Sequence, residues 1–269
     1  MSILSNTRSL SRDVRRLSGL MLLTACSALR LGAAPLLEES FGTVGALPAG
    51  WNPVYSGDTG TNNFTVPDIV SLGADGNYLR LNRPGTPSVS AGILYTEETF
   101  QDVSGSVIVR FAGDQLNRAS VVLRAQTNAY QPAGYGITVR NSSTEEFFQF
   151  GIMNTTQTGS GNADDIGGWV NLDRANFATN TDYEIRFSAI GDQISGSIWT
   201  TGATPTMLGS QTITDSTIGG AGYVGLRHSS GNSNATIYYK DLVVIPEPGT
   251  LLLMGLSGGA LLLSKVFRK

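Results

Sequence analysis

The chain has 269 residues, of which 41% are hydrophobic and 14% charged, against a usual charged fraction of ~25%. Its 33 glycines suit short strands joined by tight turns better than long helices. Residues 1–34 hold five arginines and one acid, and residues 246–269 hold three basic residues and one acid. Of the 18 basic and 21 acidic residues, 10 and 19 therefore remain in residues 35–245, a net charge of −9. The acidic net charge of this middle segment argues against nucleic-acid binding, which needs a basic surface.

The first segment is predicted to be a secretory signal peptide within residues 1–34. An arginine-rich stretch precedes the uncharged, largely apolar run of residues 17–29, which is too short for a membrane span. Residues 23–26 resemble a lipobox, in which Cys26 would carry a lipid; ordinary cleavage further along would make Cys26 an apolar filler. Since Cys26 is the only cysteine, no internal disulfide is possible.

Residues 35–245 are predicted to form a single all-β domain. Every second residue from Tyr183 to Ala189 is apolar, the pattern of a strand with one buried face. The Gly191-Asp192 turn that follows predicts a hairpin over residues 182–199. Similar runs are Tyr78–Asn82, Ile93–Thr96, Ser106–Phe111, Ser120–Ala125, Tyr135–Arg140, Phe147–Met153, Gly222–Arg227 and Ala235–Val244. So many strands require two packed sheets or a barrel.

The order of these features is similar to that of the concanavalin A-like, LamG-like jelly roll. The resemblance lies in the 182–199 hairpin, in the Gly-Tyr-Val-Gly-Leu-Arg segment 222–227, and in the 238–244 segment. It implies a jelly-roll β-sandwich over residues 35–245, whose closing strand pairs beside a first strand near Ser40-Phe41. An immunoglobulin-like sandwich is the alternative.

The acidic residues do not predict a hydrolytic site. Glycosidases of this fold commonly carry Glu-x-Asp-x-x-Glu along one strand, and the sequence has no such spacing. Glu97-Glu98 and Glu145-Glu146 are adjacent pairs, so on strands their side chains would point to opposite faces. His228, the only histidine, is predicted to lie in a loop. We therefore expect a protein that is not an enzyme.

Two features could hold a ligand. Trp169 follows two glycines and is the best candidate for an exposed ring that contacts carbohydrate, whereas Trp199 is predicted to be in the core. Asn162, Asp164 and Asp165 lie in a glycine-rich stretch and offer the oxygen ligands that calcium requires. The alternative for these three is a solvated polar loop, and no other cofactor is expected.

The C-terminal segment, residues 246–269, is predicted to be a sorting signal with a transmembrane helix. Pro246, Glu247 and Pro248 precede an uncharged apolar run that ends before a basic cluster of Lys265, Arg268 and Lys269. The apolar run is slightly short for a span, but Lys265 can snorkel, and the basic cluster should stay cytoplasmic. This order resembles the PEP-CTERM sorting signal, which implies an exosortase partner in a Gram-negative bacterium. A plain membrane anchor is the alternative.

Together these features predict an exported protein, first held in the inner membrane and then processed to the cell surface or extracellular matrix. The predicted domain, residues 35–245, is expected to bind exopolysaccharide or another glycan without catalysis. It is not expected to bind nucleic acid. A glycan hydrolase or lyase with an atypical site and a purely structural matrix protein are the alternatives.

Overall fold

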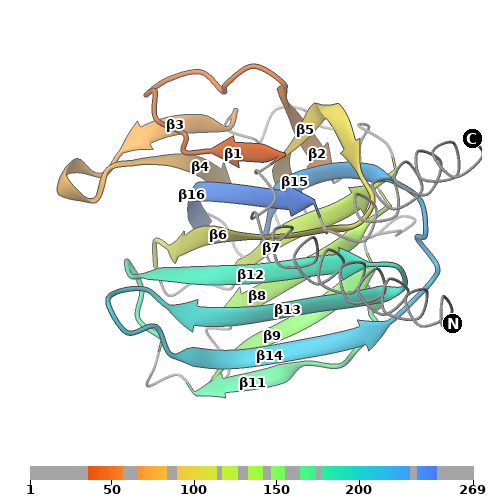
Figure 1. Ribbon diagram of the computed structural model, residues 1–269. Coiled ribbons are helices and arrows are strands. Elements are labelled where there is room, and N and C mark those ends of the chain that lie inside the picture. Colours follow the sequence, from red (N-terminus) through yellow and green to blue (C-terminus); the bar gives the residue numbers. More distant parts are fainter. Residues whose placement is uncertain are drawn as a thin grey trace, which may run out of the picture. The chain divides into compact units, whose positions relative to one another are not determined.

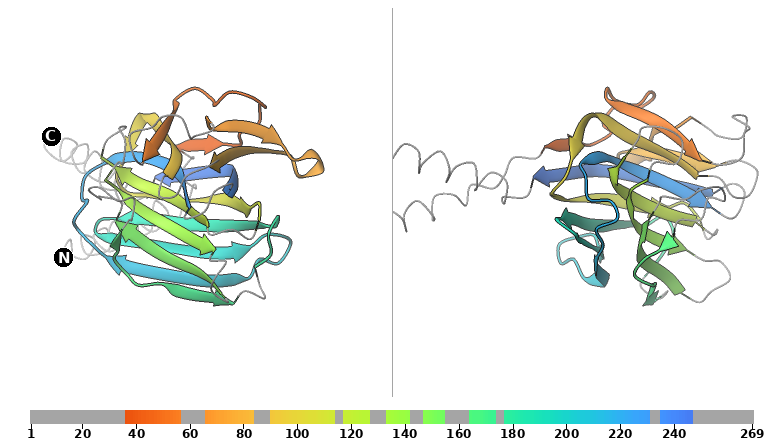
Figure 2. Two further views of the ribbon diagram at one scale, coloured as in Figure 1. Left: turned by 180° about the vertical axis from the view of Figure 1, so that it is seen from behind. Right: turned by 90° about the vertical axis from the view of Figure 1, so that its right-hand side faces the viewer.

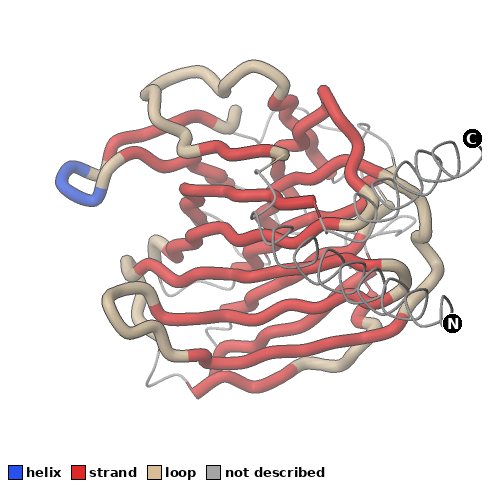
Figure 3. The backbone as a smooth tube through the Cα atoms, viewed as in Figure 1, coloured by secondary structure: helices blue, strands red, loops and turns tan. Residues whose placement is uncertain are grey.

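The computed structural model describes residues 36–56, 66–83, 90–113, 117–126, 133–141, 147–154, 164–173, 177–230 and 235–246. The chain divides into two units, residues 1–34 and 35–269, and every described residue belongs to the second. The described part contains sixteen strands and one short 3₁₀ helix, η2 (Gly73–Asp75), which Figure 3 shows in blue. The all-β prediction is confirmed. No helix among the described residues is long and apolar enough to cross a membrane.

The strands form two antiparallel sheets that lie face to face, with sheet A in front of sheet B in Figure 1 and the pair seen from the side in Figure 2. Sheet A has the order β14 (Met207–Thr214), β13 (Gln193–Thr200), β12 (Asp182–Ile190), β6 (Val103–Phe111), β16 (Ala235–Pro246), β4 (Asn77–Arg83) and β3 (Asp68–Ser71), with β1 (Leu37–Glu39) also paired to β16. Sheet B has the order β10 (Asp164–Asp165), β9 (Phe147–Asn154), β8 (Tyr135–Asn141), β7 (Asn117–Ala125), β15 (Gly222–Ser230), β5 (Ser90–Phe100) and β2 (Trp51–Ser56), with β11 (Val170–Asp173) also paired to β9.

The core lies between the sheets and follows the alternation of the sequence. In β12 the side chains of Tyr183, Ile185, Phe187 and Ala189 are all buried, and their neighbours are more exposed. The other long strands contribute alternate apolar residues to the same core cluster. One face of each sheet therefore supplies the core, and the opposite faces remain available for other roles.

All three segments on which the jelly-roll resemblance depends form strands, with residues 222–227 lying within β15. The hairpin β12–β13 turns at Gly191, whose φ of 57° suits glycine. The closing strand β16 pairs with β1, with Leu37 opposite Val244. The first strand is Leu37–Glu39, however, and not Ser40-Phe41 as predicted. Phe41 has a φ of 52°, which a strand does not permit, and its buried ring packs in the core.

Candidate functional site

The three tryptophans occupy three different environments. Trp51 is the core tryptophan, with only 5% of its surface exposed. Trp169 is half-buried and directly precedes β11. Trp199 is also half-buried, so the prediction that it belongs to the core is wrong. In β13 the buried residues are Ile194, Gly196 and Ile198, and alternation therefore turns Trp199 to the outer face of sheet A.

Two rows of mostly polar residues, one of which ends at Trp169, lie on the outer face of sheet B. Their neighbours along the strands, such as Val121, Val139 and Phe150, belong to the core, so these side chains face away from it. The strand registers give one row of Ser229, Arg118, Arg140, Gln149 and Asn171 and a second of Arg227, Ser120, Thr138, Gly151 and then Trp169. We call these ten residues the outer array.

The position of Trp169 depends on the glycine beneath it. A Cβ atom on Gly151 would lie 2.9 Å from Cε3 of the Trp169 ring, closer than real Cβ contacts allow. The Arg140 guanidinium lies 4.8 Å from the ring centre, within the range of a cation–π interaction. The amide of Gln211 donates to the carbonyls of Gly167, at 2.5 Å, and Gly168, at 2.9 Å. These contacts hold the ring over β9.

The floor of the outer array is a hydrogen-bonded, buried layer. Ser120 Oγ and Thr138 Oγ1 are 2.8 Å apart, and both side chains are buried. Gln149, also buried, accepts a hydrogen bond from Arg140 and donates to Asn171 Oδ1 at 3.0 Å. Because these buried polar side chains already have hydrogen-bond partners within the protein, they can keep their positions when a ligand binds. The layer thus positions the more accessible arginines, Trp169 and Asn171 above it.

Three arginines give the outer array a positive charge. Burial lowers the pKa of Arg118, and the neighbouring charge of Arg140 lowers it further. Burial also lowers the pKa of Arg227 to about 10, with Arg118 acting in the same direction. Arg118 and Arg227 nevertheless remain cations at neutral pH. Asp173, which is exposed, lies on the same face two residues beyond Asn171.

Tyr239 of β16 connects the array's strands to the opposite sheet. Its buried hydroxyl accepts a hydrogen bond from the Ser120 amide at 3.0 Å and donates to the Arg227 carbonyl at 2.7 Å. Burial raises the pKa of Tyr239, outweighing the opposing effects of the Ser120 amide and the Arg227 charge, so the hydroxyl keeps its proton. The two strands that carry Ser120 and Arg227 are therefore fixed from behind.

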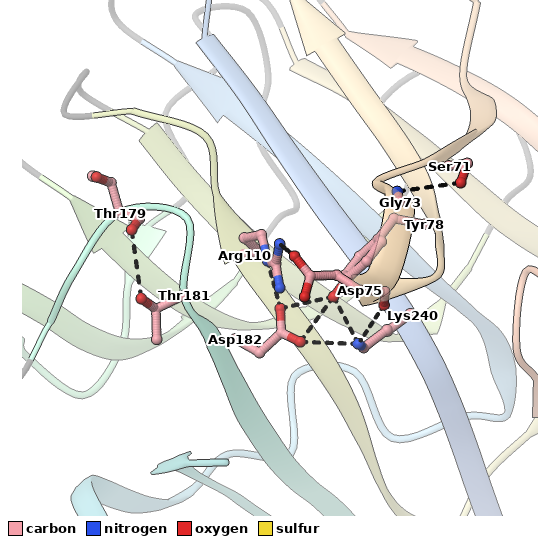
Figure 4. Close-up of polar contacts among 9 residues, drawn as sticks. All are labelled: Ser71, Gly73, Asp75, Tyr78, Arg110, Thr179, Thr181, Asp182 and Lys240. Carbon is pink, nitrogen blue, oxygen red and sulfur yellow. Dashed lines mark hydrogen bonds and ion pairs between the residues drawn. The ribbon is translucent and has the colours of Figure 1, made fainter. Parts of the chain in front are cut away.

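Sheet A carries a second charged group on its outer face, shown in Figure 4. Asp182 accepts hydrogen bonds from Arg110 Nε at 2.6 Å and from the Tyr78 hydroxyl at 2.8 Å, and it pairs with Lys240 Nζ at 2.9 Å. Arg110 also pairs with Asp75 at 2.8 Å. Two cations thus meet two carboxylates, and the group joins β4, β6, β12 and β16. This balanced, self-paired cluster is suited to a structural role.

A groove of about 310 Å³ also lies on the outer face of sheet A. Its polar lining includes Arg186, Ser188, Ser195, Ser197, Ser210 and Thr212. Trp199 stands close by, with the Arg186 guanidinium 4.3 Å from its ring centre and its Nε1 donating to Ser197 Oγ at 2.8 Å. Arg186 also pairs with Glu184 at 2.7 Å. These side chains satisfy one another, so we rank this groove below the outer array.

Other predicted positions have mixed outcomes. His228 is fully buried inside β15, with Nε2 3.1 Å from Asn117 Oδ1, so the prediction of a loop histidine is wrong. Glu97 and Glu98 are exposed neighbours in β5. Asp164 and Asp165 form β10, while Asn162 lies outside the described residues. In the part of the chain that is described, no three His, Cys, Asp or Glu residues are grouped to hold a metal ion. The calcium site, which includes Asn162, stays a prediction.

The terminal predictions concern residues that the structure does not describe. Cys26, Glu247, Pro248, Lys265, Arg268 and Lys269 all lie outside the described residues. Pro246 is the last residue of β16, opposite Val103. The sorting motif and the lipidation site therefore stay predictions.

No protein-family model and no curated protein matches the sequence. Among solved structures, the CBM2 module of the evolved Dit of Lactobacillus casei BL23 phage J-1 is similar with a TM-score of 0.52 and 14% identity, over 79% of this chain and 95% of that one. The exoplasmic/lumenal domain of VIP36, in its Ca²⁺/Man3GlcNAc-bound form, has a TM-score of 0.50 and 13% identity, over 74% and 87%. A xylan β-1,4-xylosidase from Bacillus halodurans C-125 has a TM-score of 0.50 and 12% identity, over 77% of this chain and 38% of that one. At such identities the likeness concerns the fold alone: the described residues form an antiparallel two-sheet sandwich that resembles the concanavalin A-like jelly roll.

Proposed function

We propose that the chain is an exported surface or matrix protein that binds polysaccharide, without catalysis, through the outer array. The observation that carries this proposal is the arrangement of Trp169 beside ordered polar side chains on one sheet face. An aromatic ring offers an apolar surface to a sugar ring, while nearby guanidinium and amide groups can bond its hydroxyls. The VIP36 domain of similar fold was solved with a bound glycan, which supports the same class of ligand.

A hydrolase or lyase is the weaker proposal. Glycoside hydrolysis uses two carboxyl groups about 5–10 Å apart across the scissile bond. The outer array holds no carboxylate, and Asp173 at its margin is a single one. The likeness to a xylosidase concerns the fold, and this chain spans 38% of that enzyme.

The cellular part of the proposal depends on the termini. The signal peptide would export the chain, and the PEP-CTERM-like segment 246–269 would hold it in the inner membrane until an exosortase processed it. The cell surface or the extracellular matrix would be its destination. Exopolysaccharide is then the glycan that the outer array would meet there.

The test compares two tryptophan variants of the full chain, purified in detergent. We expect affinity electrophoresis in gels containing polysaccharide to show retardation of the wild type. Trp169→Ala should weaken binding on the order of tenfold, as loss of an aromatic contact predicts. Trp199→Ala is the matched control, since it removes the same side chain from the other sheet. If neither variant changes the retardation, the outer array is not the binding site. Reducing-end release that one Asp or Glu substitution abolishes would replace binding with hydrolysis.

A further inference from the structure

The segment that carries Trp169 interrupts the edge of sheet B. Residues 166–169 lie between β10 and β11, and only two residues of β9, Gly151 and Ile152, lie opposite these four. The two surplus residues make this segment a bulge, in which local strand pairing is lost; we call it the Trp169 bulge. The Ile166 amide still donates to the Ile152 carbonyl at 3.2 Å. Beyond that bond the ladder between β9 and its edge is open until β11 begins.

A side chain from the other sheet completes the hydrogen bonds of the Trp169 bulge. Gln211 lies in β14 of sheet A, and its Oε1 accepts a hydrogen bond from the Ile152 amide at 2.8 Å. Its Nε2 donates to the carbonyls of Gly167, at 2.5 Å, and Gly168, at 2.9 Å. The carboxamide has one oxygen acceptor and two N–H donors, and all three are used on backbone groups. Gln211 therefore bonds the bulge as a neighbouring strand would.

The glycines of the Trp169 bulge allow this close approach. A Cβ atom on Gly167 would lie 2.6 Å from Nε2 of Gln211, so a larger residue there would displace the amide. Gly168 has a φ of 73°, a conformation that suits glycine. Trp169 follows directly, with its ring against Gly151. The direction in which the ring leaves the backbone is thus set by the two peptide groups that Gln211 holds.

We infer that Gln211 is the positioning residue of the polysaccharide site, acting on the ligand only through Trp169. This inference rests on the proposed function. Gln211 fixes the peptide groups before Trp169, and so the plane of the indole ring, before a sugar arrives. A group that is already held in its binding position loses less conformational freedom when the ligand binds. Affinity at the outer array, on sheet B, therefore depends on a residue of sheet A.

The test measures binding of the full chain, purified in detergent, to immobilised xylan, galactomannan and polygalacturonate, and continues with the polymer that the wild type binds most tightly. Gln211→Glu keeps the length and the acceptor but replaces the donors with a carboxylate oxygen, which the two glycine carbonyls repel. Gln211→Met keeps the length and loses all three bonds. Both variants should weaken binding on the order of tenfold, as Trp169→Ala should. Circular dichroism should show both to be folded, because Gln211 lies outside the core cluster.

A double-mutant cycle separates positioning of the ring from a general effect on stability. In a chain that already carries Trp169→Ala, Gln211→Glu should cause no further loss of affinity, because no ring is left to position. Gln126→Glu is the matched control for the substitution itself. Gln126 directly follows β7, and its amide donates to the Arg124 carbonyl at 2.9 Å. The Gln126 variant should bind like the wild type.

The outcomes separate this inference from the proposed function. If Trp169→Ala weakens binding while both Gln211 variants bind like the wild type, the positioning role fails and the proposed function stands. If Trp169→Ala has no effect, or if no polymer is bound, both fail. If Gln211→Glu costs as much affinity without Trp169 as with it, or if Gln126→Glu costs as much as Gln211→Glu, the loss reflects general stability. Unfolding of both Gln211 variants would likewise assign Gln211 to the fold and overturn the inference.

Discussion

Trp51 packs between Phe41 and Tyr95 in the core, with ring centroids 5.7 and 5.6 Å away. Trp199 instead covers the outer face of sheet A, where Arg186 lies over its ring. Trp51 thus contributes to the core, whereas Trp199 contributes to packing on the surface. The alternation of Ile194, Gly196 and Ile198 in β13 already contained the information that Trp199 faces outward, because a shift of one residue reverses the face.

The two tryptophans should differ in their effect on stability. Trp51→Ala should lower the free energy of unfolding by about 3–5 kcal/mol, as large core truncations do. Trp199→Ala should lower it by about 1 kcal/mol, the size of a partly exposed cation–π contact. Urea denaturation followed by far-ultraviolet circular dichroism measures both. Equal losses for the two variants would show that Trp199 is a core residue after all.

At the scale of the strands, the central strands could be predicted from the sequence, and most edge strands could not. The alternating runs correspond to β4 to β9, β12, β13, β15 and β16. The edge strands β2, β3 and β14 were not predicted. β2 contains Pro53, which an edge strand tolerates because it need not donate every ladder bond. β14 is largely polar because it lies at the margin of sheet A.

The charged cluster of Figure 4 joins four of the strands of sheet A and should make stability depend on pH. Burial raises the pKa of Asp182, but hydrogen bonds from Arg110, Lys240 and Tyr78 outweigh it, so the net shift is downward. A carboxyl group with a lowered pKa in the folded state stabilises it above the unfolded value of about 3.9. That contribution is lost as the pH falls through the lowered pKa.

Asp182→Asn should therefore reduce stability at pH 7 by about 2 kcal/mol, somewhat less than for a fully buried pair. It should also flatten the decline of stability below pH 4. Asp68→Asn is the control, because its ion pair with Arg80 is about one third exposed and should contribute little. Thermal melting from pH 2 to pH 7 gives both profiles. If the Asp182→Asn profile keeps the full slope of the wild type below pH 4, other carboxyl groups control acid unfolding.

At the scale of the molecule, the outer array depends on which strands become neighbours. The sequence predicts two members of the outer array. Trp169 could be singled out because two glycines precede it. Arg140 ends a predicted strand, so its side chain should point away from the side to which Val139 points. The pairing of Arg118 with Arg140, and of Arg227 with Ser120, depends on the order β15-β7-β8. Arg227 and Ser120 are 107 residues apart in the chain, and Arg118 and Arg140 are 22 apart. Alternation within one strand cannot specify such pairings, because it gives the face but not the neighbour.

The last prediction concerns the C-terminal segment as part of the whole chain. An inert anchor needs only an apolar run and a basic stop. Here Pro246 and Pro248 should favour an extended entry to the predicted helix, because each fixes φ near −65° and lacks an amide donor. Glu247 between them would be presented at the membrane surface, where a processing enzyme could bind it.

Replacing Pro246-Glu247-Pro248 with three alanines should leave membrane insertion intact, because the apolar run and Lys265, Arg268 and Lys269 remain. It should abolish processing, so that the full-length chain accumulates in the inner membrane. The measurement is a C-terminal tag followed by membrane fractionation in a host that has an exosortase. Lys265→Arg is the control, since it keeps the basic stop and the motif and should be processed normally. If the alanine variant loses its tag as fast as the wild type, or if both keep it, the segment acts only as an anchor.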